Sequence, residues 1–576
     1  MSPGGTGLTG ERGTRDDVPV RARMDTRRAS GLRWGLAMAL VGSACGDDGA
    51  PVAQGTGDTG DGSTGSHADS STGGGPTGTT SEGSDDGLDS SSGGTGSEPA
   101  YPEPDAHPPN VGPGGPAVVF TPEDLYLDCA YLDGGTGDID HHNLVVMFDG
   151  YLMMPWAPEW GSGGLSFFDI SDPCAPQVLS HTPAPDMRET HATGLTQVGD
   201  RWYAVVSSKR AGLSIEGGIL IWDVTNVAAP EVVAKLYLPG HLYPDAYARV
   251  VLSVAWQAPY IYVGGADNGV YIVDASDPTS PELVGQYGFE PTLRVGQVNV
   301  VGNMLIATAA EGPRTGLLDI SVPEFPQPIA GGDFEIVDGT GMIRESYFSN
   351  IGGGYVFYAI KNGAGGMLMV DIHDPGSPTL AGYYDSGGNG GYVFAKDELA
   401  FVGESSFASI YDVSDPSAIS QVATLSLTGD LDTATPIGNV VVLSVDDEAD
   451  TNQASAIAPY ATEVDTRPPR VTWSVPEDGT TGLPVSARVG VTFSEMVDVK
   501  SAWLGSVRLY RTDDAGEVIP VEGHISVQEN VVNFAPVNAL DPATTYTFEI
   551  PAGGVADYNG NRVEEAFSLS FTTIGG

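Results

Sequence analysis

The sequence has few basic residues and no long apolar run, and each shortage excludes a class of protein. It holds 25 Lys and Arg against 75 Asp and Glu in 576 residues, a formal net charge of −50. A surface this acidic repels phosphate groups, which argues against nucleic acid and an anionic membrane surface as partners. The charge fits a soluble exported protein.

Cysteine is also scarce, with three residues in the whole chain, Cys45, Cys129 and Cys174. Cys45 stands close to the N-terminus in a context of its own, described below. The other two are expected to pair as a disulfide in an oxidising compartment, with free thiols as the alternative.

Motifs that mark catalytic nucleophiles and metal-dependent hydrolases are missing from the chain. There is no G-x-S-x-G, no H-E-x-x-H and no P-loop lysine. With so many carboxylates, an acid pair of the glycosidase type can be drawn almost anywhere, so abundance of Asp and Glu is no evidence for catalysis. We therefore assign no catalytic residue from the sequence.

Residues 24–45 have the order of a secretory signal. Arg27, Arg28 and Arg33 precede an apolar run at 34–41, which is shorter than the ~20 residues that span a bilayer. Small residues then lead directly to Cys45, which resembles the lipidated cysteine of a bacterial lipobox. The alternative is ordinary signal cleavage with Cys45 left free. Met24 is the expected start, so residues 1–44 comprise an upstream extension and a lipoprotein signal peptide.

Residues 45–113 are predicted to be a disordered acidic tether. The segment is mostly Gly, Ser, Thr, Asp and Pro, and no Lys or Arg occurs between Arg33 and Arg188. Such a composition buries too little apolar surface to offset the entropy of ordering. We expect it to hold the following domain away from a membrane.

Six similar segments recur along residues 114–464. Each has a short β-branched or aromatic run that ends in Asp, as in VYIVDASDP at 270–278, and the intervals between these aspartates are 41 to 54 residues. The aspartate side chain can accept a hydrogen bond from a backbone N–H two residues on and so close a turn. The six repeat turn aspartates are Asp169, Asp223, Asp274, Asp319, Asp371 and Asp412.

About four short strands per repeat, at a period near fifty residues, predict a β-propeller. These segments resemble the LVIVD-repeat family, a resemblance that implies this fold and export but no reaction. We predict seven blades, with six or eight as alternatives. Residues 438–450 and 454–461 supply strands for the seventh, and 117–120 and 124–128 are expected to close the ring.

Residues 465–576 alternate apolar and polar positions between Gly and Pro turns. About seven short strands in this length predict a β-sandwich. The segments FSEMVD (493–498), DPATTYTFEI (541–550) and GGVADYNGN (553–561) resemble the bacterial Ig-like domain of the S-layer type. That resemblance implies a spacer or adhesion module.

Two groups of residues are candidate metal ligands. Asp446, Asp447, Glu448 and Asp450 offer the hard oxygen ligands that calcium prefers, although a solvated loop is the alternative.

His141, His142 and His191 are expected near the inner strands, where histidines could bind a transition metal. Hydrogen-bonded histidines at blade edges are the expected role instead. The run Asp557 to Asn561 also resembles a set of metal ligands, but Asn-Gly between apolar stretches is typical of a tight turn, which is the role we expect.

Taken together, the sequence predicts an all-β exported lipoprotein of the cell envelope, at the outer membrane or the cell surface. We expect a non-catalytic binding or scaffold protein whose propeller binds an envelope protein or a glycan and no nucleic acid. No cofactor is expected, with calcium left open. The alternative is an extracellular hydrolase or lyase that acts on a sugar or ester in the central channel, which predicts a channel ringed by His, Asp and Glu.

Overall fold

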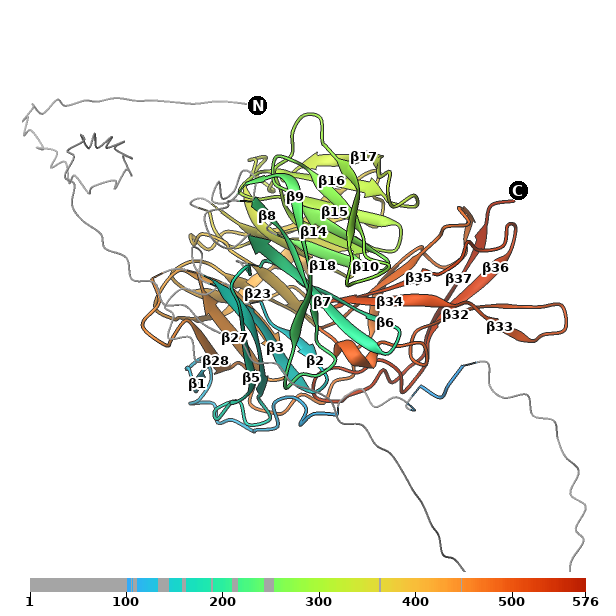
Figure 1. The fold of residues 1–576 in the computed structure, drawn as a ribbon. Coiled ribbons are helices and arrows are strands. Elements are labelled where there is room, and N and C mark those ends of the chain that lie inside the picture. The colour runs from blue at the N-terminus through green and yellow to red at the C-terminus, as the bar shows by residue number, and fades with distance from the viewer. Residues whose placement is uncertain are drawn as a thin grey trace, which may run out of the picture. The chain divides into compact units, whose positions relative to one another are not determined.

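The structure is a computed structural model that describes residues 101–104, 106, 111–132, 144–157, 162–187, 190–209, 216–242, 253–361, 364–446 and 448–575. Within these ranges the regular structure is β-strand, apart from two 3-10 turns at Pro416–Ala418 and Val499–Ser501. The predicted all-β fold class is confirmed (Figure 1).

Seven antiparallel groups of four strands follow one another in the described part of the chain, and each group is one blade of a β-propeller. Blade 1 comprises β2 (Val146–Phe148), β3 (Tyr151–Trp156), β4 (Gly163–Asp169) and β5 (Gln177–Ala184), and blade 2 comprises β6 (Gly194–Val198), β7 (Arg201–Lys209), β8 (Glu216–Asp223) and β9 (Glu231–Leu242). Blade 3 comprises β10 (Val254–Gln257), β11 (Tyr260–Gly264), β12 (Val270–Asp274) and β13 (Glu282–Tyr287), and blade 4 comprises β14 (Val295–Val301), β15 (Met304–Ala309), β16 (Arg314–Asp319) and β17 (Gln327–Glu335).

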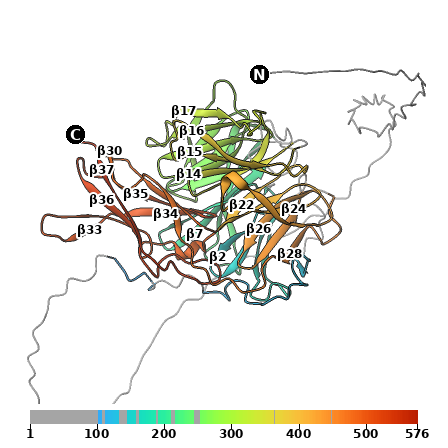
Figure 2. The same ribbon diagram turned by 180° about the vertical axis from the view of Figure 1, so that it is seen from behind.

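Blade 5 comprises β18 (Ser346–Gly352), β19 (Tyr355–Ile360), β20 (Met367–Asp371) and β21 (Thr379–Tyr384). Blade 6 comprises β22 (Val393–Lys396), β23 (Leu399–Gly403), β24 (Ala408–Asp412) and β25 (Ser420–Leu425). Blade 7 comprises β26 (Leu431–Ile437), β27 (Val440–Val445), β28 (Ser455–Pro459) and β1 (Ala130–Tyr131). The last two blades are seen from behind in Figure 2. The first strands of successive blades contact one another from β6 through β26, so they line the propeller axis. The predicted seven blades are confirmed among the described residues.

The ring is closed by a strand from the N-terminal side, but not by the segments predicted for this role. Strand β1 pairs with β28, with Ala130 opposite Ile457. Neither predicted segment forms a strand: Ala117 and Phe120 donate single backbone hydrogen bonds to Ser171 and Thr462, and Tyr126 donates one to Pro459 of β28. The prediction was wrong because Pro122 has no N–H to donate, and a turn closed by Thr121 and Asp124 separates the two segments.

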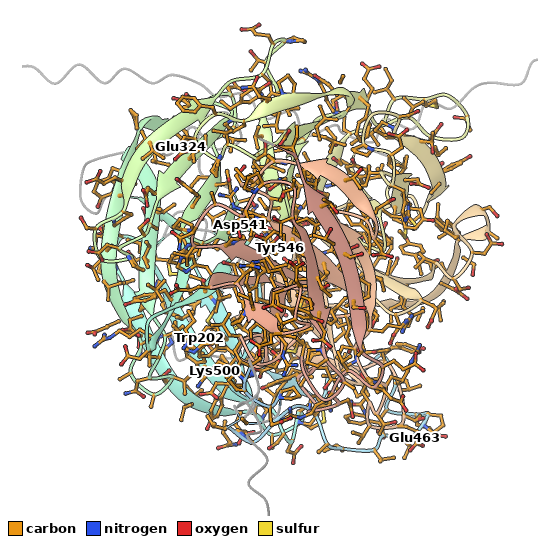
Figure 3. The ribbon with its side chains drawn as sticks, turned by 90° about the vertical axis from the view of Figure 1, so that its right-hand side faces the viewer. Trp202, Glu324, Glu463, Lys500, Asp541 and Tyr546 are labelled. Atoms are coloured by element: carbon orange, nitrogen blue, oxygen red, sulfur yellow. A yellow bond between two sulfur atoms is a disulfide. The ribbon has the colours of Figure 1, made fainter. Side chains whose placement is uncertain are left out.

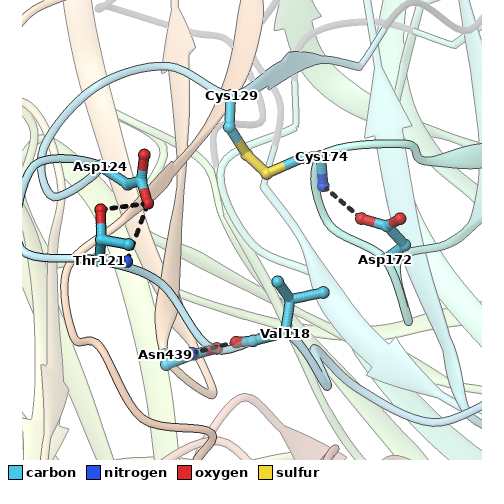
Figure 4. The surroundings of a disulfide bond; sticks show 7 residues. All are labelled: Val118, Thr121, Asp124, Cys129, Asp172, Cys174 and Asn439. Carbon is cyan, nitrogen blue, oxygen red and sulfur yellow. Dashed lines mark hydrogen bonds between the residues drawn. A yellow bond between two sulfur atoms is a disulfide. The ribbon is translucent and has the colours of Figure 1, made fainter.

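A disulfide between Cys129 and Cys174 joins the two ends of this ring (Figure 4). The N–H of Cys129 donates to the carbonyl of Ile457, 2.8 Å away, which places this cysteine beside the last blade. Cys174 lies in the turn after β4 of the first blade, where its N–H donates to Asp172. The bond therefore links blade 7 to blade 1, and we call this junction the ring seam.

Hydrophobic side chains fill the spaces between neighbouring blades. Ile272 of blade 3 packs with Val298 and Leu305 of blade 4, and Leu317 of blade 4 packs with Val356 of blade 5. All five side chains are almost fully buried. Since burial of a large aliphatic side chain stabilises by about 1.5–3 kcal/mol, these layers hold the ring together.

Residues 465–575 form a β-sandwich of nine strands, two more than the sequence suggested. One sheet has the order β29 (Val471–Val475), β31 (Val489–Phe493), β35 (Val531–Pro536) and β34 (Gly523–Gln528). The other has the order β30 (Thr480–Leu483), β37 (Phe567–Thr573), β36 (Thr545–Ile550), β32 (Arg508–Thr512) and β33 (Val518–Pro520). Val491 and Phe534 of the first sheet meet Phe548 and Phe571 of the second in the core.

The sandwich is joined to the propeller by strand pairing. Strand β34 pairs with β6, the first strand of blade 2, so that the two domains share one eight-stranded sheet. Ser526 lies opposite Thr196 and Val527 lies opposite Leu195. The pairing covers the inner edge of β6, which would otherwise present unpaired N–H and C=O groups.

Candidate functional site

The six repeat turn aspartates each end the third strand of a blade. In every case Oδ1 accepts a hydrogen bond from the N–H two residues on, at 2.8–3.0 Å. In the turns after Asp169, Asp274 and Asp412 a serine hydroxyl also donates to the same oxygen. These aspartates therefore have a structural role in the turns.

Aromatic side chains from non-adjacent blades fill part of the propeller axis. His191 precedes β6 of blade 2, whereas Phe348 lies in β18 of blade 5 and Tyr392 precedes β22 of blade 6. The ring centroid of His191 lies 4.4 Å from that of Phe348 and 5.5 Å from that of Tyr392, and Phe348 and Tyr392 stack at 4.3 Å. Contacts between blades 2 and 5 must cross the axis, so we call this group the aromatic plug.

The aromatic plug belongs to a larger buried cluster. Met147 of blade 1, Phe394 of blade 6 and Ile437 of blade 7 pack in it, and so does Met496 of the sandwich. A channel enzyme would instead need a ring of His, Asp and Glu there. His191 is held among aromatic rings, while His141 and His142 lie outside the described residues.

The sandwich contacts all seven blades on the side of the turns between their first and second strands. Six of these contacts are hydrogen bonds. The seventh is a close approach of Gly438 to Asn559, so close that a Cβ atom added to this glycine would lie 2.5 Å from Asn559 Oδ1. The hydrogen-bonded pairs are Asp498 with Gly150, Ser526 with Thr196, Ser526 with Ala258, Asn533 with Gly302, Asn530 with Ile351, and Ser494 with Asp397.

The turn between β34 and β35 reaches the first strand of blade 5. Asn350 Nδ2 donates to Glu529 Oε2 at 2.6 Å, and Asn530 Nδ2 donates to the carbonyl of Ile351 at 2.9 Å. Burial raises the pKa of Glu529 to about 7. Because β18 lines the axis, this turn contacts the wall of the axis on the sandwich side, and the aromatic plug fills part of the axis.

Charged side chains of the sandwich also reach blade 1. Lys500 Nζ lies 2.9 Å from Asp149 Oδ2 and 5.7 Å from the centroid of Phe148, whose ring packs against Trp202. Figure 3 labels Lys500 and Trp202. Burial raises the pKa of Asp498 to about 7, and its carboxylate accepts from the N–H groups of Asp149 and Gly150.

Lys396 is the centre of a buried ionic cluster between blade 6 and the sandwich. Its Nζ lies 2.6 Å from Asp465 Oδ2 and also pairs with Glu495. Burial alone would lower the pKa of Lys396, but the neighbouring carboxylates outweigh it and the pKa is raised. Burial raises the pKa of Glu495 to about 8 and that of Asp557 to about 6.

This cluster is where the described residues bring three carboxylates together. One oxygen from each of Asp465, Glu495 and Asp557 lies within 4.8 Å of the others, a geometry that suits a metal ion. The ammonium of Lys396 already pairs with two of them, so it supplies the positive charge that a cation would bring.

The predicted acidic run does not form such a group among the described residues. Asp446 donates its N–H to the carbonyl of Asp430, and the carbonyl of Asp450 accepts from Gln453. Asp447 lies outside the described residues, and Glu448 has a φ of +62°. The predicted turn at Asp557 forms, with Asn561 donating from its N–H and Nδ2 to that carboxylate.

A pocket of about 430 Å³ opens between blades 4 and 5 and the sandwich, and we call it the junction pocket. Its floor includes the buried side chains of Met304 and Trp473, while the exposed residues Asp319, His373 and Glu477 lie at its rim. A pocket of this size, mainly apolar and at a domain interface, is typical of small-molecule binding sites. It was not predicted from the sequence, because its walls come from two domains.

Two family models match the chain. The LVIVD repeat matches residues 249–288 and 350–386, which cover blades 3 and 5, and the bacterial Ig-like domain matches residues 465–573. Both predicted resemblances are thus confirmed. The chain contains LVIVD repeats within a β-propeller and a bacterial Ig-like domain, and the Ig-like domain suggests an extracellular bacterial protein.

Known proteins add little beyond these matches. Similar solved structures include a Lactobacillus plantarum protein, with 10% identity and a TM-score of 0.40 over 69% of this chain and 99% of that chain. Another is the β-propeller domain of Myceliophteria thermophila Cps50 (Swd1), with 11% identity and a TM-score of 0.39 over 56% of this chain and 98% of that one. At these scores neither carries an argument about function. No curated protein matches the chain.

The described residues form no helix that is long and apolar enough to cross a membrane.

Proposed function

We propose that the protein is an exported cell-envelope lipoprotein that acts as a non-catalytic binding or scaffold protein. The signal-like residues 24–45 support export, and Cys45 is the proposed site of lipidation. The acidic segment 45–113 would hold the folded part away from the membrane. Residues 45–100 lie outside the described ranges, so the proposal for them depends on the sequence. The described residues at the end of the segment pack on the folded part, where the buried Tyr101 donates its hydroxyl to the carbonyl of Leu509 and Gly112 donates its N–H to the carbonyl of Asp149, so the proposed tether ends before Tyr101.

The observation that carries the non-catalytic role is the packing of aromatic rings across the propeller axis. The aromatic plug fills it with rings from three blades, and the turn that holds Glu529 covers it from the sandwich side. A hydrolase or lyase of the predicted alternative would need an open channel with exposed acids and bases. The described residues therefore favour binding at surfaces outside the axis.

The expected partner is an envelope protein or a glycan. The net charge of −50 argues against nucleic acid, and we propose that calcium is not needed for folding because Lys396 neutralises the buried carboxylates. The outer membrane or the cell surface is the proposed location.

The anchor is tested by mass spectrometry of the mature N-terminus from membranes of cells that express the full chain. We expect a lipid-modified Cys45, and a Cys45→Ser variant that no longer fractionates with membranes. Unmodified Cys45 with the protein in the soluble fraction would overturn the lipoprotein assignment.

Binding is tested with the lipid-free Cys45→Ser chain as bait for solubilised envelope proteins and glycans, with and without calcium. We expect one saturable partner whose binding is independent of calcium. Turnover of sugar or ester substrates in place of saturable binding would support the enzyme alternative.

A further inference from the structure

The junction pocket contains a histidine that the repeat itself does not require. Five of the six repeat turns have Ser or Thr two residues after the aspartate, whereas the turn after Asp371 has His373. Both the N–H and Nδ1 of His373 lie within hydrogen-bond distance of Asp371 Oδ1, at 2.9 and 2.8 Å. A serine would close the same turn, so turn formation does not explain why a histidine stands at this position on the rim of the pocket.

The floor of the junction pocket holds a buried polar atom without a partner. Trp473 is 8% exposed, and its Nε1 finds no hydrogen-bond acceptor among the described residues. This atom is buried too deeply to meet a ligand in the pocket, so the ring of Trp473, and not its N–H, is the group available there. Trp473 also lines the pocket, and its ring meets the edge of His373 at 6.2 Å between centroids.

The charge at the rim is of one sign. Asp319 and Glu477 are exposed at the mouth of the junction pocket, and no Lys or Arg is among the described residues that line it. Asp319 uses Oδ1 to accept from the N–H of Ser321, at 2.8 Å. Carboxylates beside an aromatic ring favour a ligand with positive charge, and the apolar floor favours an apolar body.

We propose that the junction pocket binds a small organic cation with an apolar body, such as an amine on an aromatic skeleton. The apolar body lies on Met304 and Trp473, and the ammonium group is held by Asp319 and Glu477. This inference deepens the proposed binding function and depends on it. It adds a ligand class and a place in the fold, at the junction of the two domains.

A charge series of three probes with the same aromatic body tests the proposal. The lipid-free Cys45→Ser chain, labelled with 5-fluorotryptophan, is titrated with phenethylamine, 2-phenylethanol and phenylacetate. Comparison with Trp473→Phe assigns the fluorine resonance of Trp473 among those of the other tryptophans. We expect phenethylamine to shift this resonance saturably and to bind about tenfold more tightly than the neutral alcohol, with phenylacetate the weakest.

Variants at the rim separate the charge from the fold. Glu477→Gln should reduce the preference for the amine over the alcohol and leave the affinity for the alcohol unchanged. Glu282→Gln, at an exposed position in β13 of blade 3 that does not line the pocket, is the matched control and should change neither. His373→Ser introduces a residue found at the same position in the other repeat turns, so we expect the fold to be unchanged. We expect this variant to bind the amine more weakly.

The proposal is overturned if no probe shifts the Trp473 resonance saturably, if the three probes bind equally, or if phenylacetate binds best. If one of these results is obtained while Cys45 is lipidated and an envelope partner is captured saturably, only the proposed ligand of the junction pocket is overturned. Absence of lipidation and of capture would instead overturn the proposed function.

Discussion

Loss of the disulfide at the ring seam should destabilise the propeller strongly. The perturbation is the double variant Cys129→Ser and Cys174→Ser in the Cys45→Ser chain, which leaves no free thiol. The bond joins the strand that completes blade 7 to the turn after β4 of blade 1. Without it, the two-residue pairing of β1 with β28, single backbone hydrogen bonds from the segment before β1 to blades 1 and 7, and side-chain packing hold the ends of the ring.

The magnitude follows from the length of the closed loop. The two cysteines are 45 residues apart, and closing a loop of this length removes enough entropy from the unfolded chain to stabilise by about 4 kcal/mol. That value is a large fraction of the 5–15 kcal/mol that is typical of folded domains. We therefore expect a large drop in the urea midpoint.

Urea unfolding measures the change in free energy, and hydrogen exchange locates it. Exchange of the Cys129 position and of strands β1 and β28 should become faster before that of blades 3 to 5, because the seam opens first. A loss below about 1 kcal/mol, or uniformly faster exchange in all blades, would refute this account of the seam.

Three further changes test other parts of the structure. Glu529 has a pKa raised to about 7 against an ordinary value of 4.5, so the folded state holds its proton more tightly and stability should fall as pH rises from 4.5 to 7. The Glu529→Gln variant should lose that part of the fall, and equal urea midpoints against pH for both proteins would contradict the burial of this carboxyl. Lys396→Ala leaves buried carboxylates without their cation, and we expect a loss of about 3–5 kcal/mol, partly restored by calcium in urea titrations. A Lys396→Ala protein as stable as the wild type would show that the cluster is open to solvent. Phe348→Ala removes a ring from the aromatic plug and should lose about 3–5 kcal/mol by thermal or urea unfolding, whereas a loss near zero would mean that the axis is not packed.

The repeat pattern was enough to predict the propeller because each blade carries its own local signal. A β-branched run that ends in Asp, followed by a turn, needs no information from the rest of the chain. The turn after Asp274 closes in this way, with the N–H and hydroxyl of Ser276 donating to one oxygen. The same local logic predicted the turn at Asp557.

The arrangement of the two domains was beyond the sequence because it depends on contacts between distant residues. Ser526 and Thr196 are opposite one another in a shared sheet although they are 330 positions apart. The resemblance to an Ig-like domain suggested a spacer. Nothing in the residue pattern of β34 predicts that its free edge pairs with a strand of the propeller. Lys396 and Glu495 likewise carry no local mark of their pairing.

One departure from the repeat could have pointed to the junction pocket, although it was not singled out in the sequence. His373 interrupts a position that is Ser or Thr in the five sister turns. Its meaning depends on Trp473, one hundred residues away, whose ring it meets at the pocket. A departure from a repeat is therefore informative once the fold shows what lies beside it.

The central claim is that the Ig-like domain closes the propeller, so that binding takes place outside the axis. A cysteine cross-link between Thr196 and Ser526 tests it most directly, because opposite residues of paired antiparallel strands have the Cα spacing of a disulfide. In the Cys45→Ser chain, mild oxidation should join Thr196→Cys to Ser526→Cys in nearly every molecule, and should not join Thr196→Cys to Thr547→Cys in the other sheet. Free thiols at positions 196 and 526 after oxidation would contradict the account, since the two domains would then not share a sheet.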